Sequence, residues 1–307
     1  MFRRILIPWA TATHAAPAQQ DTLALARSIA TRTGATIILA HLLADAGITP
    51  RDNNGGTRGE RAEVERVAQH LREQGIDAEA ITETGPVAEG ILRIAHTNQA
   101  DVVALAPPHH VAFADIWQPD LTRRILATLS LPVLITPRSP VPPSTVQRAL
   151  RLLSDPYASV IVPLDGSALA ERALPHAQTF AEVYHRPLLL TRVVKPVTAY
   201  VTPAASTVLV MAEEEANAQE ARRYLDLTRT RLAQQATQPV HVLLRVGQPA
   251  DEICQALKVN AGSLVVMSTH GRSGVTRALW GSVTTAVMRQ TVAPLLMVPN
   301  AAPALGA

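Results

Sequence analysis

The chain has 307 residues, of which 47% are hydrophobic and 17% are charged, and its formal net charge is +3. This length suits two α/β domains of about 150 residues each, and the composition is typical of a globular protein with a substantial core. The small net charge, without a dense Lys/Arg block, argues against a nucleic-acid surface, and no apolar run approaches the roughly 18 residues of a membrane-spanning helix.

Residues 1–8 read as a strand, because their apolar run is too short for a signal peptide. Cys254 is the single cysteine, so no disulfide can form within the chain. Both observations favour a cytoplasmic location. We expect Cys254 to be a small buried residue on a helix rather than a reactive thiol.

Short apolar segments alternate with helical patterns along the chain. In the first half the strand-like segments include 5–8, 37–41, 101–105 and 131–137, with a helix near 58–74. In the second half we expect strands over 160–164, 187–194, 241–246, 264–267 and 295–298, and helices near 168–184, 206–236, 249–260 and 282–291. The helix over 206–236 carries charges around an apolar stripe, which predicts a long, exposed amphipathic helix.

Three segments of the first half recur in the second half at a constant offset of 162 positions. The matching pairs are Gly85–Ala88 with Gly247–Ala250, Asp101–Leu105 with Ser263–Met267, and Leu131–Pro137 with Ala293–Pro299. A constant offset indicates an internal duplication, in which each copy has five strands in a parallel sheet with right-handed crossovers. We expect a first domain over 1–138, a linker over 139–157, a second domain over 158–300 and a tail over 301–307.

The residues after the apolar strand 264–267 point to a ligand. Ser268-Thr269-His270-Gly271 is followed, after nine residues, by Gly281-Ser282-Val283, where a helix is expected to begin. A glycine in a turn lets the backbone approach a ligand closely, and a Gly-Ser pair at a helix start presents free N–H groups to an anion. Together these residues predict a phosphate-binding turn, and a nucleotide is the obvious ligand.

These residues resemble the signature of the universal stress protein family, Gly-x-x-Gly, nine residues, then Gly-Ser/Thr. The segments 162–167 and 292–299 are also similar to the family pattern, so the chain resembles a tandem member of the family. The resemblance covers the second copy by its motif, and the first copy by pattern and duplication only. It implies an α/β fold of two tandem Rossmann-like domains of the adenine nucleotide alpha hydrolase-like type, each with a five-stranded parallel sheet flanked by helices.

The resemblance also implies a site for ATP, or for AMP or ADP in its place, with Mg²⁺, in the second domain. Asp165, after Pro163, is expected beside the adenine, and Val193 is expected to flank the base. Met267 and Ser268 are expected against the base and ribose. The residues expected to hold the phosphates are Gly271, Gly281, Ser282 and Val283, and Arg272 is a candidate for one further charge-assisted contact.

Both copies depart from the signature. In the second copy, Ser268 stands in place of the first glycine, which adds a side chain near the ribose. The first copy departs further, because it has Ala10, Ala106, His109, Pro119 and Asp120 where the second has Asp165, Ser268, Gly271, Gly281 and Ser282. A proline removes an N–H group and an aspartate repels phosphate, so the first copy is interpreted as a degenerate structural partner.

Three classes of function are compared. The leading one is a nucleotide-binding regulatory protein of the stress response. The second is an interaction scaffold in which Gly271 and Gly281 only shape turns. The third is an enzyme that adenylates substrates, but the Ser-Gly-Gly-x-Asp-Ser loop that this chemistry needs is absent after the strand 160–164.

No catalytic residues and no metal site are expected, so the predicted chemistry is slow ATP hydrolysis at most. His109 and His110, with Asp115 and Asp120, lack a recognisable ligand spacing. In this family the last strands pair across a twofold axis. We therefore expect the strands 133–135 and 295–297 to pair within one chain or between two chains of a homodimer, and we expect an unidentified protein partner.

Overall fold

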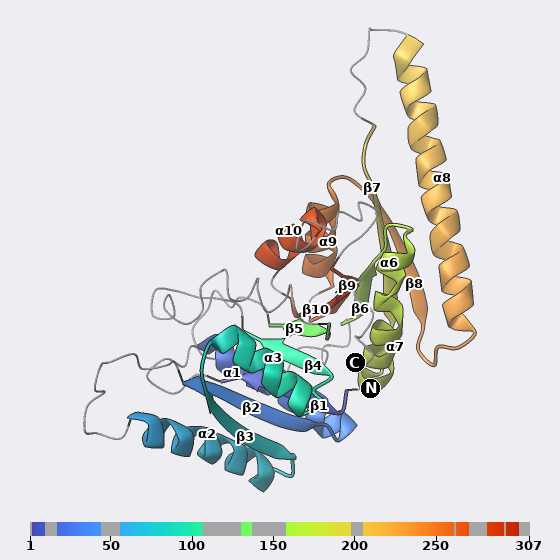
Figure 1. Ribbon diagram of the computed structural model, residues 1–307. Helices are drawn as coiled ribbons and strands as arrows, with labels where there is room; N and C mark the ends of the chain where they lie inside the picture. The colour runs from blue at the N-terminus through green and yellow to red at the C-terminus, as the bar shows by residue number, and fades with distance from the viewer. Residues whose placement is uncertain are drawn as a thin grey trace. The chain divides into compact units, whose positions relative to one another are not determined.

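The protein is described by a computed structural model over residues 2–9, 17–43, 56–106, 130–136, 158–197, 205–260, 262–269, 281–291 and 293–300 (Figure 1). The chain divides into two compact units, Met1–Arg151 with Ala301–Ala307, and Leu152–Asn300. The predicted linker, 139–157, and the predicted tail, 301–307, lie outside the described residues. Among the described residues, none of the helices combines the length and apolar character that a membrane span requires.

The first unit contains a five-stranded parallel sheet. Its strands are β1 (Arg4–Pro8), β2 (Thr36–Leu43), β3 (Ala78–Thr84), β4 (Val102–Leu105) and β5 (Val133–Ile135), in the order β3-β2-β1-β4-β5. Its helices are α1 (Pro17–Thr33), α2 (Gly56–Glu73) and α3 (Val87–Thr97). The strands β1, β4 and β5 are almost wholly buried apolar residues, as expected for parallel strands covered on both faces.

The second unit repeats this arrangement. Its strands are β6 (Val160–Pro163), β7 (Leu188–Val194), β8 (Val240–Val246), β9 (Leu264–Ser268) and β10 (Leu295–Val298), in the order β8-β7-β6-β9-β10. Its helices are α6 (Ala168–Glu171), α7 (Ala173–Tyr184), α8 (Ala205–Ala233), α9 (Pro249–Val259) and α10 (Ser282–Gln290). The helices α7 and α8 lie on one side of these strands and α9 and α10 on the other (Figure 1), as right-handed crossovers require.

Individual residues repeat together with the strands. Gly85 and Gly247, 162 positions apart, both have positive φ angles, 135° and 150°, at the turns before α3 and α9. Asn98 and Asn260 end these two helices, and each side-chain amide donates to a carbonyl four residues earlier, at 2.9 and 2.8 Å. The predicted duplication and the predicted α/β fold of two parallel sheets are therefore confirmed.

The helix predicted over 168–184 is interrupted. Its first turn, α6, ends at Glu171, and α7 begins at Ala173. Pro175 explains the break, because proline has no N–H group to donate to the carbonyl of Glu171, four residues earlier.

The helix α8 is long, as predicted, but its apolar stripe covers only its second half. There Ala221, Leu225 and Leu232 are buried, together with Thr228, at a spacing of three and four residues. In the first half, Leu209 and Met211 are 71% and 64% exposed. Leu209 and Met211 therefore do not pack on the sheet of this unit.

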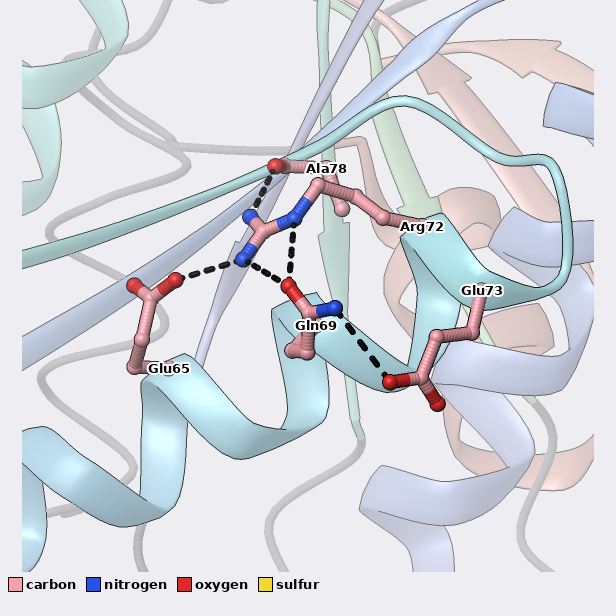
Figure 2. A network of polar contacts seen from close by, with 5 residues as sticks. All are labelled: Glu65, Gln69, Arg72, Glu73 and Ala78. Carbon is pink, nitrogen blue, oxygen red and sulfur yellow. Dashed lines mark hydrogen bonds and ion pairs between the residues drawn. The ribbon is translucent and has the colours of Figure 1, made fainter.

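A polar network joins the end of α2 to the start of β3 (Figure 2). The Arg72 guanidinium donates to the backbone carbonyl of Ala78 at 2.8 Å, to Glu65 at 2.6 Å and to Gln69 at 2.9 Å. Gln69 in turn donates to Glu73 at 3.2 Å. One side chain thus holds the helix against the strand that follows it.

Candidate functional site

A cavity of about 490 Å³ lies in the second unit at the carboxyl ends of β6, β7 and β9. In the sheet order, β7 and β8 lie on one side of β6, and β9 and β10 lie on the other. The strand order therefore reverses at β6, and this is the place where parallel α/β sheets bind ligands. The volume lies within the roughly 300–1,000 Å³ of small-molecule pockets.

Most of the residues predicted from the signature line this cavity. They are Pro163, Asp165, Val193, Met267, Ser268, Gly281, Ser282 and Val283. Gly271 and Arg272 lie outside the described residues, as do Ala10, His109, Pro119 and Asp120 of the first copy. The structure thus brings together side chains and backbone from β6, β7, β9 and α10.

The helix α10 begins at the cavity without a side-chain cap. Gly281 is its N-cap residue, and no side chain accepts a hydrogen bond there. The first helical hydrogen bond runs from the N–H of Thr285 to the carbonyl of Gly281, at 3.0 Å. The N–H groups of Ser282, Val283 and Thr284 therefore have no acceptor within the helix, and the helix dipole adds partial positive charge at this end.

Hydrogen bonds attach the start of α10 to the end of β9. The Thr284 hydroxyl donates to the carbonyl of Ser268 at 3.2 Å. The N–H of Gly281 donates to the carbonyl of Thr269 at 2.8 Å. These bonds fix the N–H groups of Ser282, Val283 and Thr284 relative to the strand, so an anion would meet them without rearrangement of the helix start.

Asp165 is held by the turn that leads from β6 into α6. Its Oδ1 accepts from the N–H of Ser167 at 3.0 Å and from the Ser167 hydroxyl at 2.6 Å. The Ser167 oxygen also caps α6 by accepting from the N–H of Ala170 at 3.1 Å. The carboxylate of Asp165 is therefore fixed at the cavity wall by local contacts.

The sequence interpretation missed the polar residues that β7 and α8 contribute to the cavity. Arg192 is 7% exposed, and its guanidinium lies 4.0 Å from the Glu220 carboxylate and 5.0 Å from the centroid of the Tyr224 ring. Lys195 and Asn217 also line the cavity. An arginine within the apolar run of β7 was the signal that could have identified this region, because arginine is rarely buried without partners.

The Tyr224 hydroxyl extends this group of residues, because it donates to the Glu171 carboxylate at 2.9 Å. Burial, followed by the hydrogen bond to Glu171, raises the pKa of Tyr224. Tyr224 is therefore neutral at physiological pH, and its ring supports the Arg192 guanidinium by a cation–π contact.

In the first unit, His41 occupies the strand position that corresponds to Arg192. Its Nδ1 lies 2.8 Å from the carbonyl of Trp9, and its Nε2 lies 3.6 Å from the Glu60 carboxylate on α2. Both copies thus place a basic side chain of the second strand beside an acidic residue of the next helix. Among the described residues of the chain, no three His, Cys, Asp or Glu side chains are grouped to hold a metal ion.

Cys254 is buried on α9. Burial raises the pKa of its thiol, which keeps the thiol protonated and unreactive at neutral pH. The expected structural role of this cysteine agrees with its position.

Comparison with known proteins identifies the family. The model of the universal stress protein family matches residues 1–137 and 156–299. Universal stress protein MJ0531 of Methanocaldococcus jannaschii is 27% identical over 143 residues, which are 46% of this chain and 82% of that protein.

Two solved structures share the fold along almost the whole chain. A universal stress protein from Archaeoglobus fulgidus has a TM-score of 0.62 at 19% identity and covers 97% of this chain and 98% of its own. A functionally unknown protein from Pseudomonas aeruginosa PAO1 has a TM-score of 0.62 at 17% identity, with 97% and 92% covered. Because the family model matches both halves, the chain belongs to the universal stress protein family, as a tandem member.

Proposed function

We propose that the second unit binds an adenine nucleotide, which is ATP or, in its place, AMP or ADP, together with Mg²⁺. The observation that carries the proposal is the uncapped start of α10, whose N–H groups meet a cavity of about 490 Å³ at the point where strand order reverses. In this proposal the protein is a cytoplasmic regulatory protein of the stress response, whose conformation or assembly responds to the bound nucleotide.

Each group of cavity residues has a role in this proposal. Val193, Met267 and Pro163 provide apolar walls for the base, and the Asp165 carboxylate accepts a hydrogen bond from an amino or hydroxyl group of the ligand. The N–H groups of Ser282 and Val283 bind phosphate oxygens. Gly271 and Arg272 belong to the proposed phosphate site on sequence grounds alone.

The first unit is proposed to bind no nucleotide. Pro119 and Asp120 stand at the positions of Gly281 and Ser282. The aspartate carboxylate would repel a phosphate, and the proline supplies no N–H donor. We assign no catalytic residue, so the proposed activity is binding, with slow hydrolysis at most. A homodimer or an intramolecular pair through the last strands stays a prediction.

Gly281→Pro tests the proposed site. The φ angle of Gly281 is −62°, which proline can adopt, so the helix is expected to form. The ring removes the N–H that joins Gly281 to Thr269 and fills space at the phosphate position. We expect Mg-ATP to raise the melting temperature of the wild type and to leave that of Gly281→Pro unchanged.

Gly281→Ala is the matched control, because it retains the N–H group and fits the same φ angle. It should respond to Mg-ATP as the wild type does. If Mg-ATP leaves the wild type unchanged, the protein is an interaction scaffold of this fold. If Gly281→Pro binds Mg-ATP as tightly as the wild type, the site has been placed wrongly.

A further inference from the structure

Ser268 stands where the signature has a glycine, and its side chain contacts a residue that follows β10. Ser268 is the last residue of β9, is 5% exposed and lines the cavity. Its hydroxyl donates to the Oδ1 atom of Asn300 at 2.6 Å. Asn300 follows β10 and is not among the residues that line the cavity. The added side chain is therefore hydrogen-bonded to a residue that does not line the cavity.

Two further contacts fix Ser268 in this position. Its backbone pairs with Val298 of β10, and its carbonyl accepts from the Thr284 hydroxyl at 3.2 Å. The Nδ2 atom of Asn300 is buried and has no hydrogen-bond partner among the described residues. A buried amide nitrogen without a partner carries an energetic cost. Asn300 makes two contacts among the described residues: its Oδ1 atom accepts from the Ser268 hydroxyl, and its backbone carbonyl accepts from the Arg172 guanidinium.

We propose that Asn300 is a positioning residue of the nucleotide site, and that it acts by holding the Ser268 hydroxyl away from the ligand. This inference rests on the proposed function. With the hydroxyl held, only the Cβ atom of the serine takes up space that a glycine would leave open, and the backbone can still approach the ribose. Without Asn300, the hydroxyl loses this hydrogen bond and can adopt another χ1 angle that takes up space at the cavity wall.

A double-mutant cycle with Mg-ATP as the probe tests this role. Asn300→Ala should weaken the affinity measured by calorimetry about fivefold, the typical effect of one hydrogen bond. Ser268→Gly should bind at least as tightly as the wild type. In the Ser268→Gly background, Asn300→Ala should change the affinity by less than about twofold, because the hydroxyl that Asn300 holds is gone.

Asn260→Ala is the control for a purely structural effect. Asn260 donates to the carbonyl of Ala256 at 2.8 Å at the end of α9, and it is not among the residues that line the cavity. Its loss should lower the melting temperature and leave the affinity for Mg-ATP unchanged.

The outcomes separate this inference from the proposed function. If the wild type binds no Mg-ATP, the proposed function fails, and the positioning role fails with it. If the wild type binds Mg-ATP, and Asn300→Ala weakens the affinity by the same factor in the wild-type and the Ser268→Gly backgrounds, Asn300 does not act through Ser268. If Asn300→Ala has no effect in either background, Asn300 has no role in binding. Each of the last two results overturns this inference alone.

Discussion

At the scale of single residues, the proposed nucleotide binding rests on backbone N–H groups more than on charged side chains. Three consecutive residues, Ser282, Val283 and Thr284, lack helical acceptors because they begin α10, and the Gly281 N-cap supplies none. The residue at the N-cap matters, because the side-chain oxygen of a serine, threonine or aspartate there would itself accept hydrogen bonds from these N–H groups. A glycine has no such side-chain acceptor, which suits the proposed phosphate site.

Ser282→Asp separates binding from folding, because it should move the two in opposite directions. A carboxylate in the first turn of α10 interacts favourably with the helix dipole and should stabilise the protein by about 0.3–1 kcal/mol. The same charge should repel phosphate and weaken Mg-ATP binding at least about tenfold. Thermal unfolding and calorimetry measure the two effects.

Ser282→Ala is the control, since it retains the N–H group and adds no charge. Its affinity for Mg-ATP should stay within about twofold of the wild type, because the backbone donor is unchanged. Equal affinity in Ser282→Asp and Ser282→Ala would show that the phosphates lie elsewhere.

At the scale of elements, the strands and the turn after β9 could be predicted because their signals are local. The apolar runs of β6, β9 and β10 are short and bounded by polar residues or prolines, and the offset of 162 positions links β9 and β10 to their copies. The α10 start could be predicted because a Gly-Ser pair marks it. These features require no knowledge of which elements are neighbours.

The contributions of α8 and of Asn300 could not be predicted because they depend on packing. Asn217 and Glu220 line the cavity because α8 packs on β7 and β8. The sequence of a charged helix of 29 residues does not indicate which of its turns will pack on the sheet. Asn300 meets Ser268 through strand pairing, 32 residues away in the chain. The break at Arg172 was predictable in principle, since Pro175 is visible in the sequence.

Arg72→Ala tests how one side chain couples α2 to β3 (Figure 2). The variant loses a charge-assisted hydrogen bond to the carbonyl of Ala78 and three to the side chains of Glu65 and Gln69. Because Arg72 is about one-third exposed, solvent weakens the ion pair, and we expect a loss of about 1 kcal/mol in the free energy of unfolding. Urea unfolding followed by circular dichroism measures it.

Arg93→Ala is the matched control in the same unit. Among the described residues, the Arg93 guanidinium donates to the Glu83 carboxylate alone, and the Arg93 side chain is 52% exposed. Its loss should cost less than about 0.5 kcal/mol. An equal loss in both variants would mean that the bond to the Ala78 carbonyl contributes nothing specific.

At the scale of the whole molecule, the chain carries one fold twice and, in our account, one binding site. The two sheets have the same strand order, and the turns at Gly85 and Gly247 have the same unusual backbone. The copies differ at the phosphate turn, where Pro119 and Asp120 correspond to Gly281 and Ser282. Duplication followed by loss of one phosphate turn leaves a single nucleotide per chain as the expected stoichiometry.

Native mass spectrometry of the full chain titrated with Mg-ATP tests this central claim most directly. The account predicts one bound nucleotide per chain for the wild type and none for Gly281→Pro. Two nucleotides per chain, or one nucleotide that persists in Gly281→Pro, would contradict it.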